Sequence, residues 1–209
     1  MNKIRSFIFN FIYLFGSLVW SIVLLPALLF PPKTAIRIVS GVYAGSLGWA
    51  AKHVMGLELE IKGWENLPKE EPYIIAAKHQ SAFETLFVPF MKEFRYPAII
   101  LKRELTRLPI WGMYHKRLGF IPIDRSSGME AIKTMTAGCK KALDDGRSVI
   151  IFPQGTRIKP GVIAPYKPGL AKIYKDLPKQ TTGAPASQDE RLLGTMPLNY
   201  SLGLTLRNY

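Results

Sequence analysis

The sequence predicts an α/β domain, with a mixed, largely buried sheet flanked by helices and preceded by a membrane-anchoring helix or helical hairpin. Two observations carry this prediction. Between residues 57 and 176, short apolar runs of strand length alternate with longer segments of helical period, an order that builds a helix-covered sheet. Residues 7–30 form a separate apolar stretch without a charged side chain. We therefore divide the chain into an anchor (1–56), an α/β core (57–176) and an atypical, poorly ordered tail (177–209).

The apolar stretch from Phe7 to Phe30 is long enough to cross a bilayer. As a helix it would extend about 36 Å, against a hydrocarbon core of about 30 Å. No small-x-small cleavage pattern follows it before the prolines, which favours a retained anchor over a cleaved signal peptide. Basic residues flank both ends, so the positive-inside rule does not select an orientation.

The next segment, residues 34–56, is rich in small and β-branched residues but carries Arg37, Lys52 and His53. These side chains make it too polar to span a bilayer comfortably. Three placements remain open for it: on the bilayer surface, as the second arm of a helical hairpin, or as a buried first helix of the soluble domain.

The core shows five runs with the length and composition of strands, several of them continuously apolar as in buried sheets. These runs are 57–62, 72–77, 97–101, 119–123 and 148–152. The helical segments expected between and after them are 82–94, 108–118, 129–145 and 167–176. The tail opens with the polar segment PKQTTGAPASQDE, and residues 192–206 regain apolar residues without predicting a convincing element.

The charge balance indicates an anionic partner. Lysine and arginine total 28 against 15 acidic residues, a net charge of +13, which suits either nucleic acid or a lipid headgroup surface. The aromatic residues cluster in the apolar anchor and do not interleave with basic residues, which argues against nucleic acid. The single cysteine, Cys139, excludes an internal disulfide and is expected to be a packing or surface thiol. Three scattered histidines and one cysteine predict no metal site.

A histidine and a carboxylate stand where a predicted strand gives way to a helix. The segment 78–84, KHQSAFE, follows the buried run 72–77, and sites in α/β folds collect at the carboxyl ends of strands. His79 can take a proton from a hydroxyl near neutral pH if a partner orients its ring. A helix beginning near Ser81 would bring Glu84 beside the imidazole as that partner. Alone, this spacing is weak evidence, because a surface histidine near a helix-start carboxylate is commoner.

Further cationic and hydroxyl side chains follow the other strands of the core. Those that stand directly after a predicted strand, or in the glycine turn behind it, are Lys102, Arg103, Arg125, Gly155, Thr156 and Arg157. Parallel strands would deliver them, together with His79, to one edge of the sheet. Guanidinium groups pair bidentately with phosphate oxygens, so this edge would suit a phosphate. A solvated basic loop explains any one of these groups, but it explains their convergence on a histidine poorly.

The order of these blocks resembles the glycerolipid acyltransferase superfamily, in particular its PlsC-type 1-acyl-sn-glycerol-3-phosphate (lysophosphatidic acid) acyltransferases. The first block of that family is His-x-x-x-x-Asp, which is matched by His79 and, with a carboxylate one methylene longer, by Glu84. The second block is Gly-x-x-x-Ile-x-Arg, which residues 119–125 match. The resemblance covers about residues 60–176, and an apolar amino terminus is also typical of the family.

The third block departs from the family by one side chain. The family commonly has Phe-Pro-Glu-Gly-Thr-Arg, whereas residues 152–157 read FPQGTR, with Gln154 in place of glutamate. Glutamine there can donate or accept hydrogen bonds but cannot act as an acid or base. After the helix at 167–176 the family continues with a strand carrying a fourth block, where this chain has its polar tail.

The resemblance implies a role for each block. His79 would be the catalytic base, Glu84 would orient it, and Arg125 and Arg157 would hold the phosphate of the acceptor. The residues expected to assist in substrate binding are Gly155, Thr156, Gln154, Lys102 and Arg103.

The activity that the resemblance implies is fatty acyl transfer to the sn-2 hydroxyl of lysophosphatidic acid, giving phosphatidic acid for phospholipid biosynthesis. The acyl donor would be acyl-CoA or acyl-acyl carrier protein, and neither a cofactor nor a metal would be required. The expected partners are membrane lipids and these substrates, and the expected location is a bacterial inner membrane with the active site on the cytoplasmic side. Three alternatives remain open: acylation of another lysolipid such as a lyso-ornithine lipid, a truncated inactive family member, and a non-enzymatic basic protein of membrane surfaces or nucleic acid.

Overall fold

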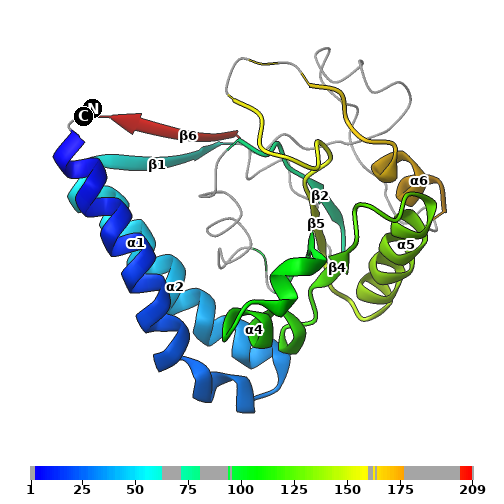
Figure 1. The fold of residues 1–209 in the computed structure, drawn as a ribbon, viewed down its shortest axis with the longest axis horizontal. Coiled ribbons are helices and arrows are strands. Elements are labelled where there is room, and N and C mark those ends of the chain that lie inside the picture. The colour runs from blue at the N-terminus through cyan, green and yellow to red at the C-terminus, as the bar shows by residue number, and fades with distance from the viewer. Residues whose placement is uncertain are drawn as a thin grey trace.

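The computed structural model describes residues 3–62, 72–80, 94, 96–159, 162, 164–176 and 203–208. Its first part is a helical hairpin: α1 (Lys3–Val23), the short 3-10 helix η1 (Leu25–Leu29) and α2 (Pro32–Met55), with the two long helices side by side (Figure 1). Prolines open both η1 and α2, where a missing N–H costs nothing. Residues 34–56 are thus the second arm of a helical hairpin, and the buried side chains of this arm also join the core of the domain.

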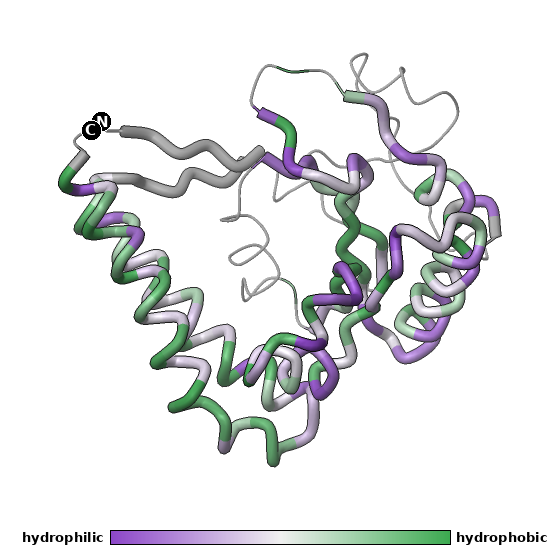
Figure 2. Tube along the Cα trace, in the orientation of Figure 1, coloured by the Kyte–Doolittle hydropathy of each residue, from purple (hydrophilic) through white to green (hydrophobic). Residues whose placement is uncertain are grey.

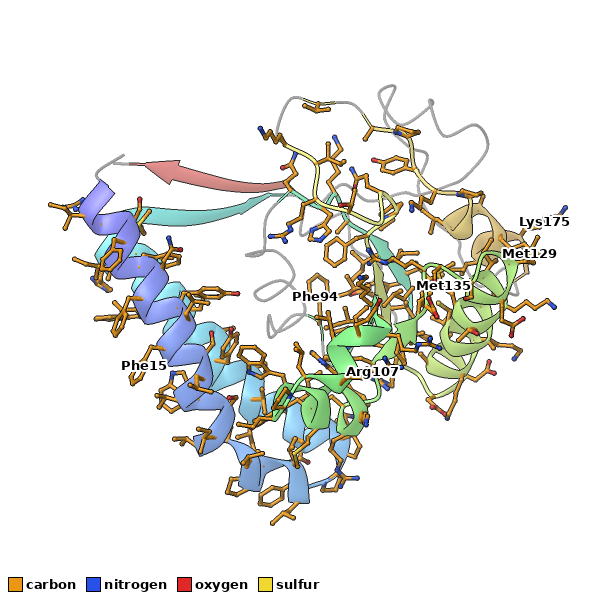
Figure 3. All side chains as sticks on the ribbon, viewed as in Figure 1. Phe15, Phe94, Arg107, Met129, Met135 and Lys175 are labelled. Carbon is orange, nitrogen blue, oxygen red and sulfur yellow. The ribbon has the colours of Figure 1, made fainter. Side chains whose placement is uncertain are left out.

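Helix α1 presents a long apolar surface to the outside. The stretch Ile4–Val23 is long and apolar enough to cross a membrane, and only 6% of it is buried. Figure 2 shows the apolar colouring along the hairpin, and in Figure 3 Phe15 points away from the rest of the molecule. Phe7 is 73% exposed and Phe11 58% exposed, which is unusual for side chains of this size in a water-soluble domain.

The core is a four-stranded parallel sheet in the order β2-β5-β3-β4, which confirms the expected α/β fold. Its strands are β2 (Ile74–Ala76), β3 (Ala98–Lys102), β4 (Ile121–Ile123) and β5 (Val149–Ile151). Each lies within or across a run that the sequence predicted. Val149 and Ile150 in the central strand are fully buried, as expected where helices cover both faces of a parallel sheet.

Alternate residues of β3 face two different hydrophobic clusters. Ala98 belongs to the cluster under α5 (Met129–Asp144) and α6 (Gly169–Asp176). Cys139 of α5 lies in the same cluster, and burial raises the pKa of its thiol to about 12, so this cysteine is a packing residue. Ile99, by contrast, belongs to the cluster on the opposite face of the sheet.

That opposite face is covered by the hairpin and by α4 (Trp111–Arg117), which follows the 3-10 helix η4 (Arg103–Arg107). One hydrophobic cluster lies between the sheet and these covering elements, and it contains residues from the hairpin, from the sheet and from the region of α4. Its buried members are Leu24, Ala27, Ala35, Ile36, Val39, Ile99, Leu101, Tyr114, Leu118 and Phe120. The expected boundary at residue 56 therefore falls inside one continuous hydrophobic core, and the hairpin is an integral layer of the fold.

A second, two-stranded sheet pairs β1 (Leu57–Lys62) with β6 (Gly203–Asn208) in antiparallel register, with Leu59 opposite Leu206. The expectation that residues 192–206 form no element is therefore wrong for the last few of them. The strand is short and begins with a glycine, Gly203, and its pairing partner β1 lies far away in the sequence. The remaining tail, 177–202, and the expected helix at 82–94, Phe94 apart, lie outside the described residues.

Candidate active site

The carboxyl ends of the four parallel strands meet at one edge of the sheet. His79 follows β2, Lys102 ends β3, Arg125 follows β4, and the third block (residues 152–157) follows β5. Because β5 lies between β2 and β3, the third block stands between the histidine and the cationic side chains. The convergence expected from the sequence follows directly from this strand order.

The third block holds His79 by its backbone and its ring. The backbone N–H of His79 donates a 3.0 Å hydrogen bond to Oε1 of Gln154, and its carbonyl accepts a 2.8 Å bond from the N–H of Ile158. The imidazole lies beside the ring of Phe152, with centroids 4.7 Å apart. His79 is half-buried, and the ring of Phe152 lies against its imidazole.

Gly155 gives the third block its sharp turn. Its φ of +69° lies in the left-handed region, which a side chain rarely tolerates, and its N–H bonds back to the carbonyl of Phe152 at 2.9 Å. The stem of Lys167 lies over this turn, since a Cβ placed on Gly155 would meet it at 3.2 Å. The turn brings Gln154 inward to 8% exposure and leaves Thr156 and Arg157 exposed.

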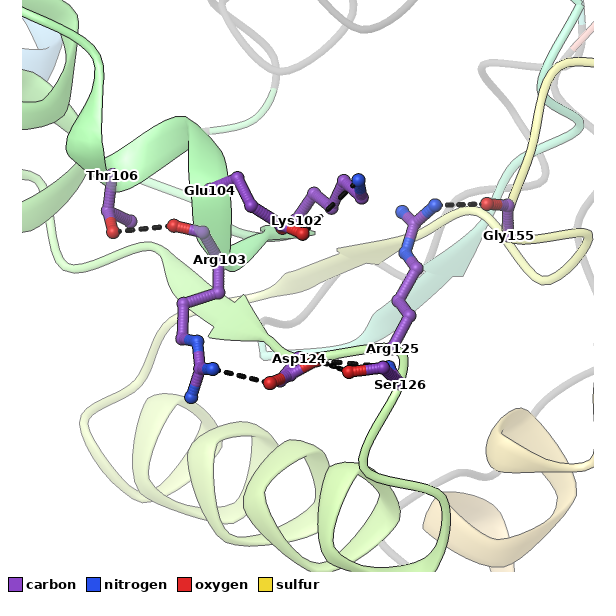
Figure 4. A network of polar contacts seen from close by, with 8 residues as sticks. All are labelled: Lys102, Arg103, Glu104, Thr106, Asp124, Arg125, Ser126 and Gly155. Carbon is purple, nitrogen blue, oxygen red and sulfur yellow. Dashed lines mark hydrogen bonds and ion pairs between the residues drawn. The ribbon is translucent and has the colours of Figure 1, made fainter.

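The second block meets the third through Arg125. Its guanidinium donates from Nη1 to the carbonyl of Gly155, as Figure 4 shows. Only one of its five N–H donors is used in this bond, and the side chain is exposed at the sheet edge. Arg125 thus lies beside the same glycine turn that holds His79.

Arg103 points in another direction, toward Asp124, with which it forms an ion pair (Figure 4). Asp124 also accepts bonds from the N–H and the hydroxyl of Ser126, and these bonds, followed by the charge of Arg103, hold the pKa of its carboxyl below the usual range. Lys102 pairs with Glu104 at 3.2 Å, with both side chains about half-exposed. The structure therefore does not bring Arg103 together with Arg125, although the two residues were expected to share a ligand.

Arg157 ends the third block, two residues after the glycine turn. Its side chain is exposed. Tyr43 of α2 shares a 2.9 Å hydrogen bond with Ser17, so the hairpin carries polar side chains within its apolar pair of helices. Glu84, the expected partner of His79, lies outside the described residues.

Comparison with known proteins agrees with this geometry. Residues 58–187 match the family model described as Acyltransferase. The chain is 33% identical over 172 residues to the 1-acyl-sn-glycerol-3-phosphate acyltransferase of Pseudomonas aeruginosa, covering 81% of this chain and 65% of that protein. It is 27% identical to the enzyme of the same name from Limnanthes douglasii, covering 83% of this chain and 60% of that protein. This chain therefore spans less than two thirds of the length of either relative.

A solved structure shares the fold. The crystal structure of the 1-acyl-sn-glycerophosphate (LPA) acyltransferase PlsC from Thermotoga maritima superposes with a TM-score of 0.59 at 25% identity, covering 84% of this chain and 71% of that one. The family match extends over more than half of the present chain and includes the histidine block, the arginine block and the glycine turn. The chain belongs to the acyltransferase family.

Proposed function

We propose that this chain transfers a fatty acyl group from a thioester to the sn-2 hydroxyl of lysophosphatidic acid, giving phosphatidic acid. The observation that carries the proposal is the clamped His79 beside Arg125 at one edge of the sheet, in a chain of the acyltransferase family. The names of the relatives support the choice of acceptor. The donor would be acyl-CoA or acyl-acyl carrier protein, used as a substrate, and no cofactor takes part.

The reaction needs one base and one anion site. His79 would take the proton of the sn-2 hydroxyl while its oxygen attacks the thioester carbonyl, and Glu84 would stabilise the imidazolium that forms. When the carbon–sulfur bond breaks, the imidazolium returns the proton to the leaving thiolate. No acyl-enzyme is required, because both substrates meet in one ternary complex, an advantage that can reach about 7–11 kcal/mol.

Arg125 and Arg157 would bind the phosphate of the acceptor, with help from the turn at Gly155 and Thr156. Lys102, about half-exposed, could release Glu104 to add a positive charge, whereas Arg103 is committed to Asp124. The apolar outer face of α1 would keep the site at the membrane, where a lysolipid acceptor resides. We place the protein at a bacterial inner membrane with this edge toward the cytoplasm, where acyl thioesters are made.

A direct assay tests the proposal. The full chain, purified in detergent, is supplied with lysophosphatidate and labelled oleoyl-CoA, and labelled phosphatidate is measured with His79→Ala as the control. A lyso-ornithine lipid and a lysophospholipid without a phosphomonoester are supplied in parallel. Acylation of one of these in preference to lysophosphatidate would reassign the acceptor, and no acylation of any of them would refute the proposal.

A further inference from the structure

The side chain of Gln154 is buried and makes a hydrogen bond within the protein. It is only 8% exposed, and its oxygen lies 3.0 Å from the backbone nitrogen of His79. A backbone N–H can be satisfied only by an acceptor, so the carbonyl end of the amide must face His79. A group that is buried and engaged in this way offers little to a lysolipid phosphate, which Arg125 and Arg157 reach from exposed positions.

The contact of Gln154 is one half of a clamp. The other half is the 2.8 Å bond from the N–H of Ile158 to the carbonyl of His79. Before it in the chain, the N–H of Ala77 bonds to the carbonyl of Ile151 at 2.9 Å, so the pairing of β2 with β5 runs on into the site. Both peptide groups that flank the Cα of His79 are therefore fixed by the segment that follows β5, through Gln154 and Ile158.

Fixing these peptide groups also fixes the direction in which the side chain of His79 leaves the backbone. The Cβ direction of a residue follows from its backbone, so the two bonds leave only side-chain rotation to be set. The contact with Phe152, with ring centroids 4.7 Å apart, restricts that rotation from one side. Supporting contacts of this kind hold a catalytic group to within a fraction of an ångström, so that it stays at hydrogen-bond distance from the substrate hydroxyl.

We propose that Gln154 is a positioning residue for His79: its neutral amide oxygen fixes the backbone of the catalytic base, and the side chain binds no substrate. This inference rests on the proposed acyltransferase function. It also explains why a glutamine can stand where the family pattern has glutamate. Both residues present an oxygen at the same distance from the backbone, so the place requires an acceptor and makes no use of a proton or a charge.

Three substitutions separate the oxygen from the size and polarity of the side chain. Gln154→Glu keeps the acceptor oxygen and the reach. Gln154→Met keeps the volume but replaces the oxygen by a thioether sulfur, a much weaker acceptor. Gln154→Asn keeps the amide but draws it back by one methylene. The expected result is that Gln154→Glu retains at least about a third of kcat, while Gln154→Met and Gln154→Asn each lose about 10- to 100-fold. KM for lysophosphatidate should stay unchanged in all three, because binding of the phosphate is not disturbed.

Amide hydrogen exchange gives a second readout that does not depend on turnover. The His79 amide should be protected in the starting protein and in Gln154→Glu, and should exchange faster in Gln154→Met and Gln154→Asn. The melting temperature in detergent identifies any variant that fails to fold, and in that case Gln154→Glu and Gln154→Asn, which stay polar, decide the outcome.

Each other result overturns the inference. Full activity of Gln154→Met would show that the oxygen is dispensable, and loss of activity in Gln154→Glu equal to that in Gln154→Met would show that accepting a bond is not its role. A raised KM for lysophosphatidate at constant kcat would make Gln154 a substrate ligand. If the starting protein acylates no lysolipid, the proposed function fails, while exchange at His79 still tests the contact.

Discussion

The phenolic hydroxyl of Tyr114 in α4 donates a 2.8 Å hydrogen bond to the backbone carbonyl of Ser21 in α1. Burial raises the pKa of this phenol to about 12, so it remains a donor at neutral pH. Close by, Arg117 donates to the carbonyls of Leu28 and Phe30 at 2.8 and 2.9 Å. These bonds provide donors for backbone carbonyls near the turn of the hairpin, and they attach the hairpin to α4.

The first prediction follows from this attachment. Tyr114→Phe should lower the free energy of unfolding by about 0.5–1.5 kcal/mol, since one buried hydrogen bond is lost while the ring stays packed. Thermal unfolding in detergent measures the change, with Met113→Leu on the exposed side of α4 as a control that should leave it unaltered. An unchanged melting temperature in Tyr114→Phe would show that the bond adds no stability.

A second prediction concerns the whole hairpin. A chain beginning at residue 57 should fail to fold, because it would expose one entire face of the sheet, including Ile99 and Leu101. Each such side chain contributes about 1.5–3 kcal/mol by its burial, against a total stability of about 5–15 kcal/mol for a typical domain. Gel filtration and circular dichroism of the shortened chain decide this. A folded, monomeric product would show that the hairpin is a separable anchor after all.

A third prediction concerns how the protein is attached to the membrane, and a high-salt wash of the membrane fraction tests it. The full chain should stay in the membrane fraction after a high-salt wash, because apolar insertion is not screened as surface electrostatics is. Replacing Phe7, Phe11 and Phe15 by glutamine should make retention salt-sensitive, since these exposed rings form much of the outer surface of α1. Complete release of the unaltered chain by salt would contradict insertion.

The catalytic roles predict a distinct pattern of losses. His79→Ala should lower kcat by about 10²–10⁴-fold without unfolding the protein, and Glu84→Ala should lose somewhat less. Glu84→Asp should remain active, because it keeps a carboxylate at that place. Near-normal turnover by His79→Ala would exclude the proposed base.

Substitution of Arg125 or Arg157 should change the Michaelis constant of one substrate more than that of the other. Arg125→Ala and Arg157→Ala should raise KM for lysophosphatidate more than KM for the acyl donor, since a charge-assisted phosphate contact is lost. Lys133→Ala, on the exposed face of α5, is the control for loss of a surface charge and should change neither constant. Damage confined to the donor would reassign both arginines.

Much of this architecture could be predicted from local pattern. Strands of a parallel sheet are short apolar runs because both faces are buried, so β2, β3, β4 and β5 could be located from composition alone. The topological rule that sites lie at carboxyl ends of strands then placed His79 and Arg125 at one edge. The family resemblance supplied the roles of these residues, and the family match confirms the resemblance.

Pairings between distant segments could not be predicted in this way. Strand β6 needs β1 as its partner, and the ion pair of Arg103 with Asp124 depends on how β3 and β4 lie in register. The same is true of Arg147, a buried residue whose guanidinium bonds to the carbonyls of Leu118 and Gly119 at 2.9 and 3.1 Å. The residues next to each of these positions in the sequence do not indicate which distant residue it will pair with.

By itself, the sequence determined which segments are apolar, where the four strands of the parallel sheet lie, and which reactive side chains follow those strands. These properties depend on neighbours in the chain, through the period of two or 3.6 residues that each element imposes. Only the tertiary structure decided that the hairpin completes the core and that Gln154 faces the backbone of His79. Such contacts join residues far apart along the chain, and their geometry is fixed only when all layers pack together.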